Sequence, residues 1–292
     1  MYRIIGVAAG FMVAIFVGWP GEAAAQASTV WRYRLKVEPQ ADRTDLVVDA
    51  EISGTGDQTI PIGLPQDCYG SPDLHRAVTR MEGLAGSQVA AGADAAHRTL
   101  SAGADGVVRV RYRLSYDPAF YAGYAFGPNT GPAHLHLGGC QWMLAPADGT
   151  APFDYEIGFA EKPEGWTLYS SLAADAATAS GRASYEDLAG TALGGGTSHR
   201  RLGTAHGPVD IFIAESPEMD EARALDAVAT IVRAQRDRFG AEGQEGFYIV
   251  SVNPRPGVLA GSAIDHLFVT FVRPDASQGE LLNLIAHEMF HN

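Results

Sequence analysis

The stretch Ser277-Gln-Gly-Glu-Leu-Leu-Asn-Leu-Ile-Ala-His-Glu-Met-Phe-His-Asn292 decides the fold of this chain. Ser277 and Glu280 form an S-x-x-E capping box, in which each side chain accepts a hydrogen bond from the backbone N–H of the other residue at a helix start. A helix that begins here places His287 and His291 on one face, about one turn apart. This is the H-E-x-x-H arrangement, in which two imidazoles bind one Zn²⁺ ion and the glutamate, here Glu288, acts as a general base.

The motif helix is apolar almost all round, which is typical of a buried helix rather than a surface one. Its apolar residues are Leu281, Leu282, Leu284, Ile285, Ala286, Met289 and Phe290. Two histidines and a glutamate are costly to bury unless something satisfies them, and a metal ion would do so. The alternative is a helix end whose histidines are only hydrogen-bonded and solvated. The apolar context favours the zinc site.

A zinc peptidase site uses three protein ligands and keeps one position open for water. The motif supplies two of them, and the sequence stops one residue after His291. A third ligand on a later helix is therefore absent from this chain. We expect the chain to be the front part of an enzyme and to be inactive by itself.

The N-terminus predicts export. Residues 1–27 fit a signal peptide, because Arg3 gives a positive start, Ile4–Trp19 is apolar, and Ala25-Gln26-Ala27 offers an A-x-A cleavage site. The alternative is an uncleaved anchor, although the apolar stretch is short for a full membrane span. We expect a periplasmic or secreted protein that is not inserted in a membrane after cleavage.

The charge and the cysteines fit such a protein. The formal net charge of −13 argues against a nucleic-acid partner, because nothing would replace the phosphate counterions. Cys68 and Cys140 are the only cysteines, and an oxidising compartment would allow a disulfide between them. Two free buried thiols are the alternative. Their spacing does not indicate metal or redox chemistry.

Two patterns divide the mature chain, so we expect two domains. Up to about residue 182, short strands with period-two alternation, such as Trp31–Val37 and Val108–Leu114, are separated by Gly, Pro and Asp clusters. This pattern is typical of a β-sandwich. The Ala- and Gly-rich stretches 85–106 and 173–196 indicate loops.

The pattern changes after His206. An apolar strand at Val209–Ala214 is followed by a helix expected to start at Ser216 and to run towards Phe239. Further apolar strands then lead into the motif helix. Helix, strand, strand and motif helix make an α/β arrangement, distinct from the first part of the chain.

Two further features have an ordinary explanation. His134 and His136 are two residues apart and would share one face of a strand. Because no third ligand is nearby in sequence, a polar strand face is favoured over a metal pair. Gly194–Gly196 lacks a following helical pattern and a Lys-Ser/Thr pair, so it indicates a flexible turn rather than a phosphate site.

The order of these parts resembles the glycyl aminopeptidase family of zinc peptidases, and more broadly the gluzincin aminopeptidases. In those proteins a β-sandwich-like domain precedes a thermolysin-like catalytic domain, and a Gly-rich edge strand precedes H-E-x-x-H. Here Gly261-Ser-Ala-Ile-Asp-His266 takes that place, and its Asp265-His266 pair resembles the glycyl aminopeptidase version. Pro163-Glu-Gly-Trp166 resembles a P-x-G-W element of the first domain, and His291-Asn292 would begin an H-x-W-N run.

The resemblance implies an α+β multidomain fold. Residues 28–182 would form an N-terminal antiparallel β-sandwich, and residues 183–292 the truncated first half of a thermolysin-like α/β metallopeptidase domain. The implied activity is an exported zinc aminopeptidase that removes small N-terminal residues, such as Gly or Ala, from peptides. The alternatives are a non-catalytic exported peptide-binding protein and a thermolysin-type endopeptidase.

The resemblance also assigns residues. His287 and His291 would bind one Zn²⁺ ion, and Glu288 would be the general base. The substrate's α-ammonium would pair with Asp265, which stands where the family carries Glu. The peptide would add as a strand beside Ser262, Ala263 and His266.

Overall fold

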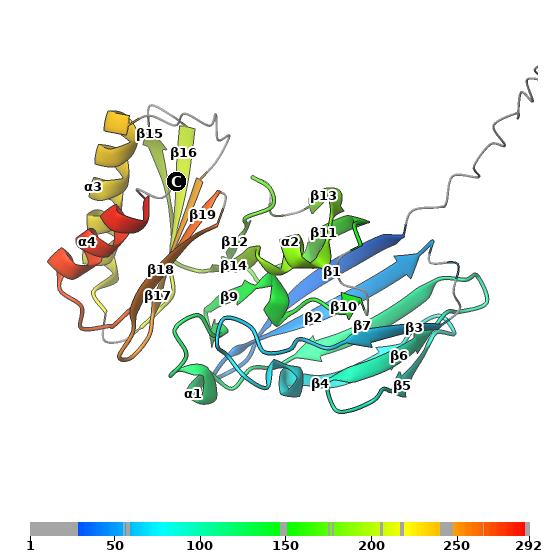
Figure 1. Ribbon diagram of the computed structural model, residues 1–292. Helices are drawn as coiled ribbons and strands as arrows, with labels where there is room; N and C mark the ends of the chain where they lie inside the picture. Colours follow the sequence, from blue (N-terminus) through cyan, green and yellow to red (C-terminus); the bar gives the residue numbers. More distant parts are fainter. Residues whose placement is uncertain are drawn as a thin grey trace, which may run out of the picture.

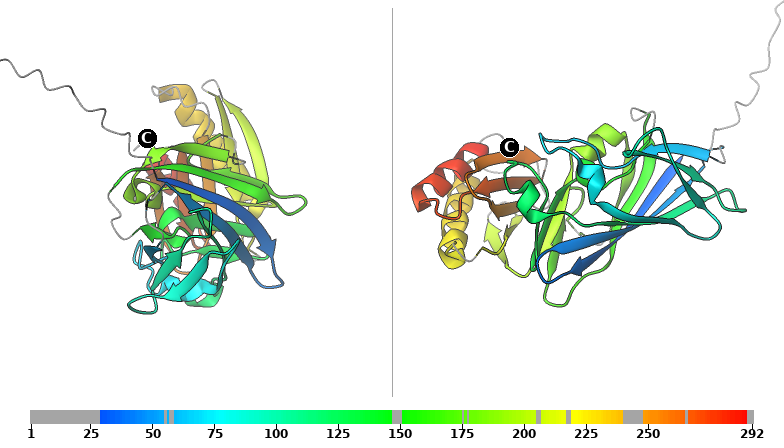
Figure 2. Two further views of the ribbon diagram at one scale, coloured as in Figure 1. Left: turned by 90° about the vertical axis from the view of Figure 1, so that its right-hand side faces the viewer. Right: turned by 90° about the horizontal axis from the view of Figure 1, so that it is seen from below.

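The computed structural model describes residues 29–289, except 55, 57–58, 147–150, 175, 177, 205–206, 217–218, 240–247 and 265. The predicted signal peptide, Asp265 and His291 lie outside the described residues. The chain forms two lobes, a larger one built from sheets and a smaller one in which two helices cover a sheet (Figures 1 and 2). None of the helices in the described ranges is long and apolar enough to span a membrane.

Three sheets build the larger lobe. The six-stranded sheet has the order β13-β11-β1-β2-β7-β4 and contains β1 (Val30–Pro39), β2 (Thr44–Ser53), β4 (Val78–Gly83), β7 (Val108–Leu114), β11 (Phe153–Glu161) and β13 (Thr178–Ala183). The second, β10-β3-β6-β5, contains β3 (Thr59–Gly63), β5 (Gln88–Ala91), β6 (His97–Ser101) and β10 (Ala145–Pro146). The third, β12-β14-β9-β8, contains β8 (Asn129–Gly131), β9 (His134–Gly138), β12 (Thr167–Ser170) and β14 (Ala192–Gly196). Short helical turns connect them: η1 (Leu74–Ala77), α1 (Pro118–Tyr121), η2 (Gly139–Gln141) and α2 (Tyr185–Ala189).

The six-stranded sheet follows from the period-two pattern. Tyr33 and Leu35 are fully buried, whereas the alternating cations on β1 face solvent and form ion pairs. The inward side chains share one core with Ile62 of β3 and Leu100 of β6, so the two sheets pack face to face. The predicted sandwich is confirmed, with one departure from antiparallel pairing, because β1 pairs with β11 in parallel.

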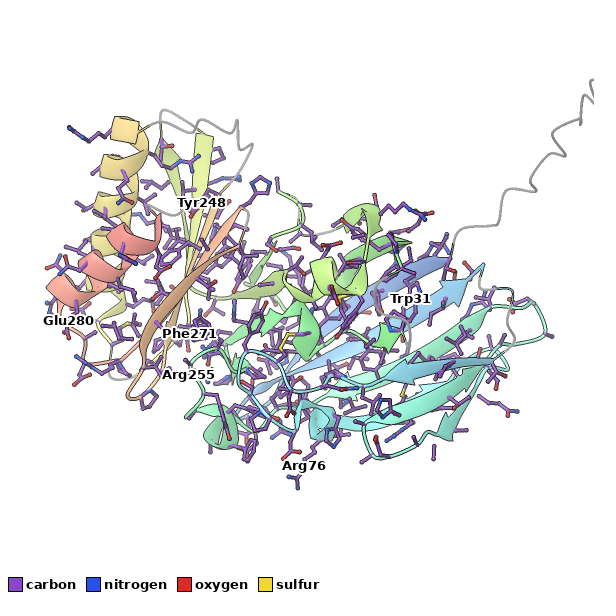
Figure 3. All side chains as sticks on the ribbon, viewed as in Figure 1. Trp31, Arg76, Tyr248, Arg255, Phe271 and Glu280 are labelled. Carbon is purple, nitrogen blue, oxygen red and sulfur yellow. A yellow bond between two sulfur atoms is a disulfide. The ribbon has the colours of Figure 1, made fainter. Side chains whose placement is uncertain are left out.

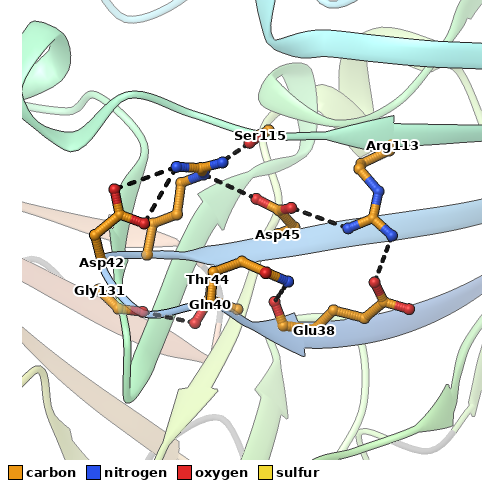
Figure 4. A network of polar contacts seen from close by, with 9 residues as sticks. Glu38, Gln40, Asp42, Thr44, Asp45, Arg113, Ser115 and Gly131 are labelled. Carbon is orange, nitrogen blue, oxygen red and sulfur yellow. Dashed lines mark hydrogen bonds and ion pairs between the residues drawn. The ribbon is translucent and has the colours of Figure 1, made fainter.

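A polar network closes one end of this sheet (Figure 4). The Asp45 carboxylate, only 5% exposed, accepts hydrogen bonds from Arg43 (3.1 Å) and Arg113 (2.9 Å). Arg43 also donates to the Ser115 hydroxyl at 2.8 Å, and Arg113 to Glu38. Both lone-pair regions of the buried carboxylate are thus matched by charged donors, which is what makes its burial tolerable.

A disulfide ties two distant segments of the larger lobe. Cys68 and Cys140 are bonded, with their Cα atoms 6.3 Å apart. Cys140 lies in η2, next to Gln141, and Cys68 lies in the segment before η1. The bond therefore closes a loop that spans 72 positions of sequence.

Two stretches predicted as loops contain strands or helices. The stretch 85–106 contains β5 and β6, and the stretch 173–196 contains β13, α2 and β14. The predicted flexible turn at Gly194–Gly196 is wrong, because these residues are buried in β14. A Cβ atom at Gly194 would lie 2.3 Å from the Leu135 carbonyl oxygen and 2.5 Å from the Tyr169 hydroxyl. The glycine is needed for close packing there.

The smaller lobe is an α/β layer. Its sheet has the order β15-β16-β17-β19-β18 and contains β15 (His199–Thr204), β16 (Gly207–Ile213), β17 (Tyr248–Pro254), β18 (Leu259–Ile264) and β19 (Leu267–Val272). The three central strands are parallel, and the two outer strands are antiparallel to their neighbours. The helices α3 (Glu221–Phe239) and α4 (Gln278–Met289) cover one face (Figure 1). The α+β fold class is confirmed.

The start of α3 and the division between the two parts of the chain differ from the positions predicted from the sequence. The helix α3 begins at Glu221 rather than at Ser216, because the Asp220 side chain accepts the hydrogen bond from the Arg223 N–H at 3.0 Å. The division after residue 182 falls within β13, and β14 beyond it still pairs with β9 in the larger lobe.

The two lobes meet through the uncovered face of the smaller sheet. Phe212, Ile249 and Leu267 of the smaller lobe pack against Tyr169 and Ala192 of the larger one. Since helices cover one face and the larger lobe the other, the parallel strands are buried on both faces.

Candidate active site

The motif helix starts as predicted. The Ser277 N–H donates to the Glu280 carboxylate at 2.9 Å, and the Glu280 N–H donates to the Ser277 hydroxyl oxygen at 3.3 Å. Arg273 donates to the other Glu280 oxygen at 2.8 Å. These hydrogen bonds, first those from Ser277, lower the pKa of Glu280 to about 2. The capping box is confirmed, and it sets the register of every residue that follows on α4.

The helix buries one face rather than its whole surface. Leu281 and Ile285 are buried against α3 and the sheet, whereas Leu282 and Leu284 are only half-buried. Gln235 of α3 donates a hydrogen bond to the Ala286 carbonyl oxygen at 2.9 Å, which joins the two helices. Although the sequence is typical of a buried helix, only one side of the described part of α4 is buried, because its contacts come from that side.

The predicted zinc ligand His287 and the predicted general base Glu288 lie on the last described turn of α4. His287 is exposed and Glu288 is half-buried. His291, the second predicted ligand, lies outside the described residues. Within the described part of the chain, no three His, Cys, Asp or Glu side chains lie close enough together to hold a metal ion.

Glu288 lies against an edge strand. A Cβ atom at Gly261, in the middle of β18, would lie 2.8 Å from Glu288 Cγ and 3.2 Å from Glu288 Cδ. It would also lie 3.0 Å from the Phe268 ring of β19. The side chain of Glu288 therefore occupies the space above the backbone of residue 261, and the absence of a side chain there admits it.

The predicted substrate residues lie on or next to β18. Ser262 and Ala263 are half-buried members of this strand, and His266 is half-buried just beyond its end. Because side chains alternate along a strand, Ala263 shares the face of Gly261 and Ser262 points to the opposite face. Asp265 lies outside the described residues. Among the described strands of its sheet, β18 pairs only with β19, so it is an edge strand.

The structure also shows a buried chain of polar side chains that joins the two lobes. His136 Nδ1 lies 2.6 Å from the Tyr169 hydroxyl, which lies 2.9 Å from the Ser251 hydroxyl of β17. Burial lowers the pKa of His136 to about 3 and that of His134 to about 4. His134 lies 3.3 Å from the Asn129 side chain. Both histidines are thus neutral hydrogen-bonding residues, and the ring of His136 also packs against Phe271 of the smaller lobe.

The structure is similar to solved structures of zinc peptidases and related proteins. The structure is similar to that of an aminopeptidase N family protein from Idiomarina loihiensis, with a TM-score of 0.65 and 15% sequence identity, over 90% of this chain and 47% of that chain. The chain has the fold of about half of that protein. An M1 zinc metallopeptidase from Deinococcus radiodurans matches with a TM-score of 0.41 and 12% identity, over 91% of this chain and 65% of that one. No family model and no curated protein matches the sequence.

The match confirms the resemblance at the level of the fold. The fold of this chain is similar to that of part of an aminopeptidase N family protein. Since the identity is low and the chain spans about half of that protein, the activity, the metal and the substrate are inferred from the residues of this chain.

Proposed function

We propose that this chain belongs to a zinc-dependent aminopeptidase that removes small N-terminal residues from peptides. The observation that carries the proposal is the contact between Glu288, on the H-E-x-x-H helix, and Gly261, on the edge strand β18. It places the proposed general base beside a strand whose backbone is able to pair with an extended peptide. A helix end with merely solvated histidines would not require a glycine opposite the glutamate.

The donor set suits zinc. His287 and His291 offer imidazole nitrogens with the i, i+4 spacing of a zinc site. When bound, zinc supplies Lewis acidity and makes a water molecule more acidic. Glu288 would accept the proton of that water and pass it to the leaving amine. The half-buried position of Glu288 keeps its carboxylate close to the strand where the scissile bond would lie.

Asp265 and the edge strand would provide the specificity for a free N-terminus. A carboxylate at residue 265 would pair with the substrate's α-ammonium, and the backbone of β18 would align the following residues. Ala263, on the same strand face as Gly261, has the smallest side chain that a strand residue other than glycine allows.

We also propose that the protein is periplasmic or secreted. The apolar N-terminal stretch with an A-x-A site supports export, and so does the Cys68–Cys140 disulfide, because disulfides persist in oxidising compartments.

The test uses the protein expressed from its whole reading frame. Zinc content and the hydrolysis of alanine and glycine anilides are measured for the wild type, for Glu288→Gln and for Glu186→Gln, an exposed glutamate on α2. We expect Glu288→Gln to lose roughly 10²–10⁴-fold in kcat with unchanged zinc content, and Glu186→Gln to behave as the wild type. A chelator should abolish the activity.

Three results would point elsewhere. Equal rates for Glu288→Gln and the wild type would remove Glu288 from the mechanism. Hydrolysis of amino-blocked peptides at the same rate as free ones would indicate an endopeptidase. Peptide binding with zinc present but without hydrolysis would indicate a non-catalytic binding protein.

A further inference from the structure

Arg255 lies in the turn between β17 and β18. Its backbone N–H donates to the Val272 carbonyl oxygen at 2.6 Å, and its carbonyl oxygen accepts a hydrogen bond from the Val258 N–H at 3.3 Å. The next residue along the chain after Val258 begins β18. The backbone of Arg255 therefore fixes the point from which the edge strand departs.

The side chain of Arg255 leaves its own sheet and enters the larger lobe (Figure 3). One terminal nitrogen donates to the carbonyl oxygens of Tyr121 and Tyr124, the latter at 2.7 Å. The other donates to those of Gly127 and Pro128, both at 3.0 Å. The residue is 3% exposed. Four hydrogen bonds to one short segment thus join the two lobes at this point.

The segment that receives Arg255 is itself held in place. The Tyr121 hydroxyl donates to the Pro72 carbonyl oxygen at 3.3 Å, and Gln141 donates to the Phe126 carbonyl oxygen at 2.8 Å. Gln141 directly follows Cys140, which the disulfide ties to Cys68. The carbonyl groups that Arg255 meets therefore belong to a cross-linked part of the larger lobe.

The contact is chemically selective for arginine. In the part of the chain that the structure describes, the guanidinium meets carbonyl dipoles and the Phe271 ring, 5.2 Å away, and no carboxylate. Burial lowers the pKa of Arg255 to about 10, so the group stays charged at neutral pH. Only a planar fork with several N–H donors reaches four carbonyl groups at once, and the compact ammonium of lysine does not.

We propose that Arg255 is a positioning residue for peptide binding, which holds the edge strand β18 in register with the larger lobe and with Glu288. This inference rests on the proposed function, since it assigns the strand's substrate role to β18. Phe126 supports the same contact, because its ring packs edge-on against Phe271 of β19 at 5.5 Å.

The inference predicts an effect that depends on substrate length. A peptide that adds to β18 as a strand forms backbone hydrogen bonds at several residues, whereas an aminoacyl anilide reaches only the first of them. Misplacement of β18 should therefore weaken the binding of longer peptides more than that of an anilide. A general loss of folded protein would reduce the apparent kcat for both substrates alike and leave KM unchanged.

The experiment compares Arg255→Lys, Phe126→Leu and Arg200→Lys in the protein expressed from the whole reading frame. Arg200 is the matched control, an exposed arginine at the opposite edge of the same sheet, on β15, paired with Asp226 at 2.9 Å. We measure kcat and KM for alanine anilide and for an alanine tetrapeptide, together with amide hydrogen exchange of β18 and β17. Zinc content serves as a check on folding at α4.

For Arg255→Lys we expect KM for the tetrapeptide to rise about tenfold, KM for the anilide to change less than about threefold, and β18 amides to exchange at least about tenfold faster. Exchange in β17 and zinc content should stay as in the wild type, and Arg200→Lys should match the wild type throughout. Phe126→Leu should shift the same quantities in the same direction by a smaller factor, and it carries the test if Arg255→Lys does not fold.

Unchanged β18 exchange, or an equal loss on both substrates at unchanged KM, would overturn the assignment. If the wild type hydrolyses neither substrate, the proposed function fails separately. The exchange measurement then still decides whether Arg255 holds β18, because faster exchange limited to this strand supports it and unchanged exchange overturns it.

Discussion

The replacement of Gly261 by alanine tests the central contact of the candidate site. The added Cβ atom would meet Glu288 Cγ at 2.8 Å and the Phe268 ring at 3.0 Å, both shorter than ordinary van der Waals contact. The Phe268 ring is fully buried and has no room to retreat, whereas the Glu288 side chain is half-buried and able to move. We therefore expect the strain to be relieved mainly by displacement of Glu288.

The size of the effect follows from two opposing contributions. Forcing a methyl group into a filled site costs about 1–3 kcal/mol. Loss of glycine's freedom in the unfolded chain returns about 0.4–1 kcal/mol. The net destabilisation should be about 0–2.6 kcal/mol, centred near about 1.3 kcal/mol, and for a chain of this size each kcal/mol lowers the melting temperature by roughly 2–4 °C. A displacement of the general base by about 1 Å would lower kcat roughly 10²-fold.

The assay is thermal unfolding by circular dichroism together with alanine anilide hydrolysis. Gly279→Ala is the matched control, because a Cβ atom at this residue of α4 meets nothing within 4 Å. It should stabilise the protein by about 0.5–1 kcal/mol, through higher helix propensity, and leave activity unchanged. Gly261→Ala with wild-type stability and full activity would refute the inferred contact.

Three further predictions concern the larger lobe. Asp45→Ala should destabilise the protein by about 2 kcal/mol in urea unfolding, because it removes a buried carboxylate that accepts hydrogen bonds from two arginines. The control Asp42→Ala removes a carboxylate that is 70% exposed, so it should change the stability by less than about 0.5 kcal/mol. Equal effects would contradict this. The Cys68→Ser, Cys140→Ser double variant should be about 4 kcal/mol less stable than the oxidised wild type, because the unfolded chain gains the entropy of the open loop. A reducing agent should lower the melting temperature of the wild type and leave that of the double variant unchanged. For His136, with its pKa lowered to about 3, the unfolded chain binds a proton near pH 6.5 and the folded chain does not, so stability falls as the pH drops from 6.5 towards 3. His136→Gln should reduce the slope of stability with pH by up to about 1.4 kcal/mol per unit in this window, and an unchanged slope would contradict the assignment.

Local rules predicted the parts of the fold that depend on neighbours in sequence. The capping box at Ser277 and Glu280 was correct because its hydrogen bonds join residues within one helical turn. The alternation of β1 was correct because one face of a strand meets the core and the other meets water. The start of α3 was wrong, since Asp220 competes with Ser216 as the cap and both residues satisfy the same rule.

Composition was a poor guide where packing decides. The stretch 173–196 is rich in Ala and Gly, which indicates a loop, yet β14 is a buried strand whose glycines permit contact with Leu135 and Tyr169. The motif helix is apolar almost all round, yet only Leu281 and Ile285 among its described residues are buried. In both cases the outcome depends on what lies opposite, which the local pattern does not contain.

The sequence by itself predicted the chemistry of the candidate site, because helix periodicity brings His287 and His291 to one face of a helix, with Glu288 next to His287 in the chain. Only the tertiary structure decided which residues lie next to the motif. Gly261 lies beside Glu288, and Arg255 joins β18 to the segment 121–128, through contacts that span long separations in sequence. The first contact depends on how α4 packs on its own sheet and the second on how the two lobes pack, and no local propensity specifies either.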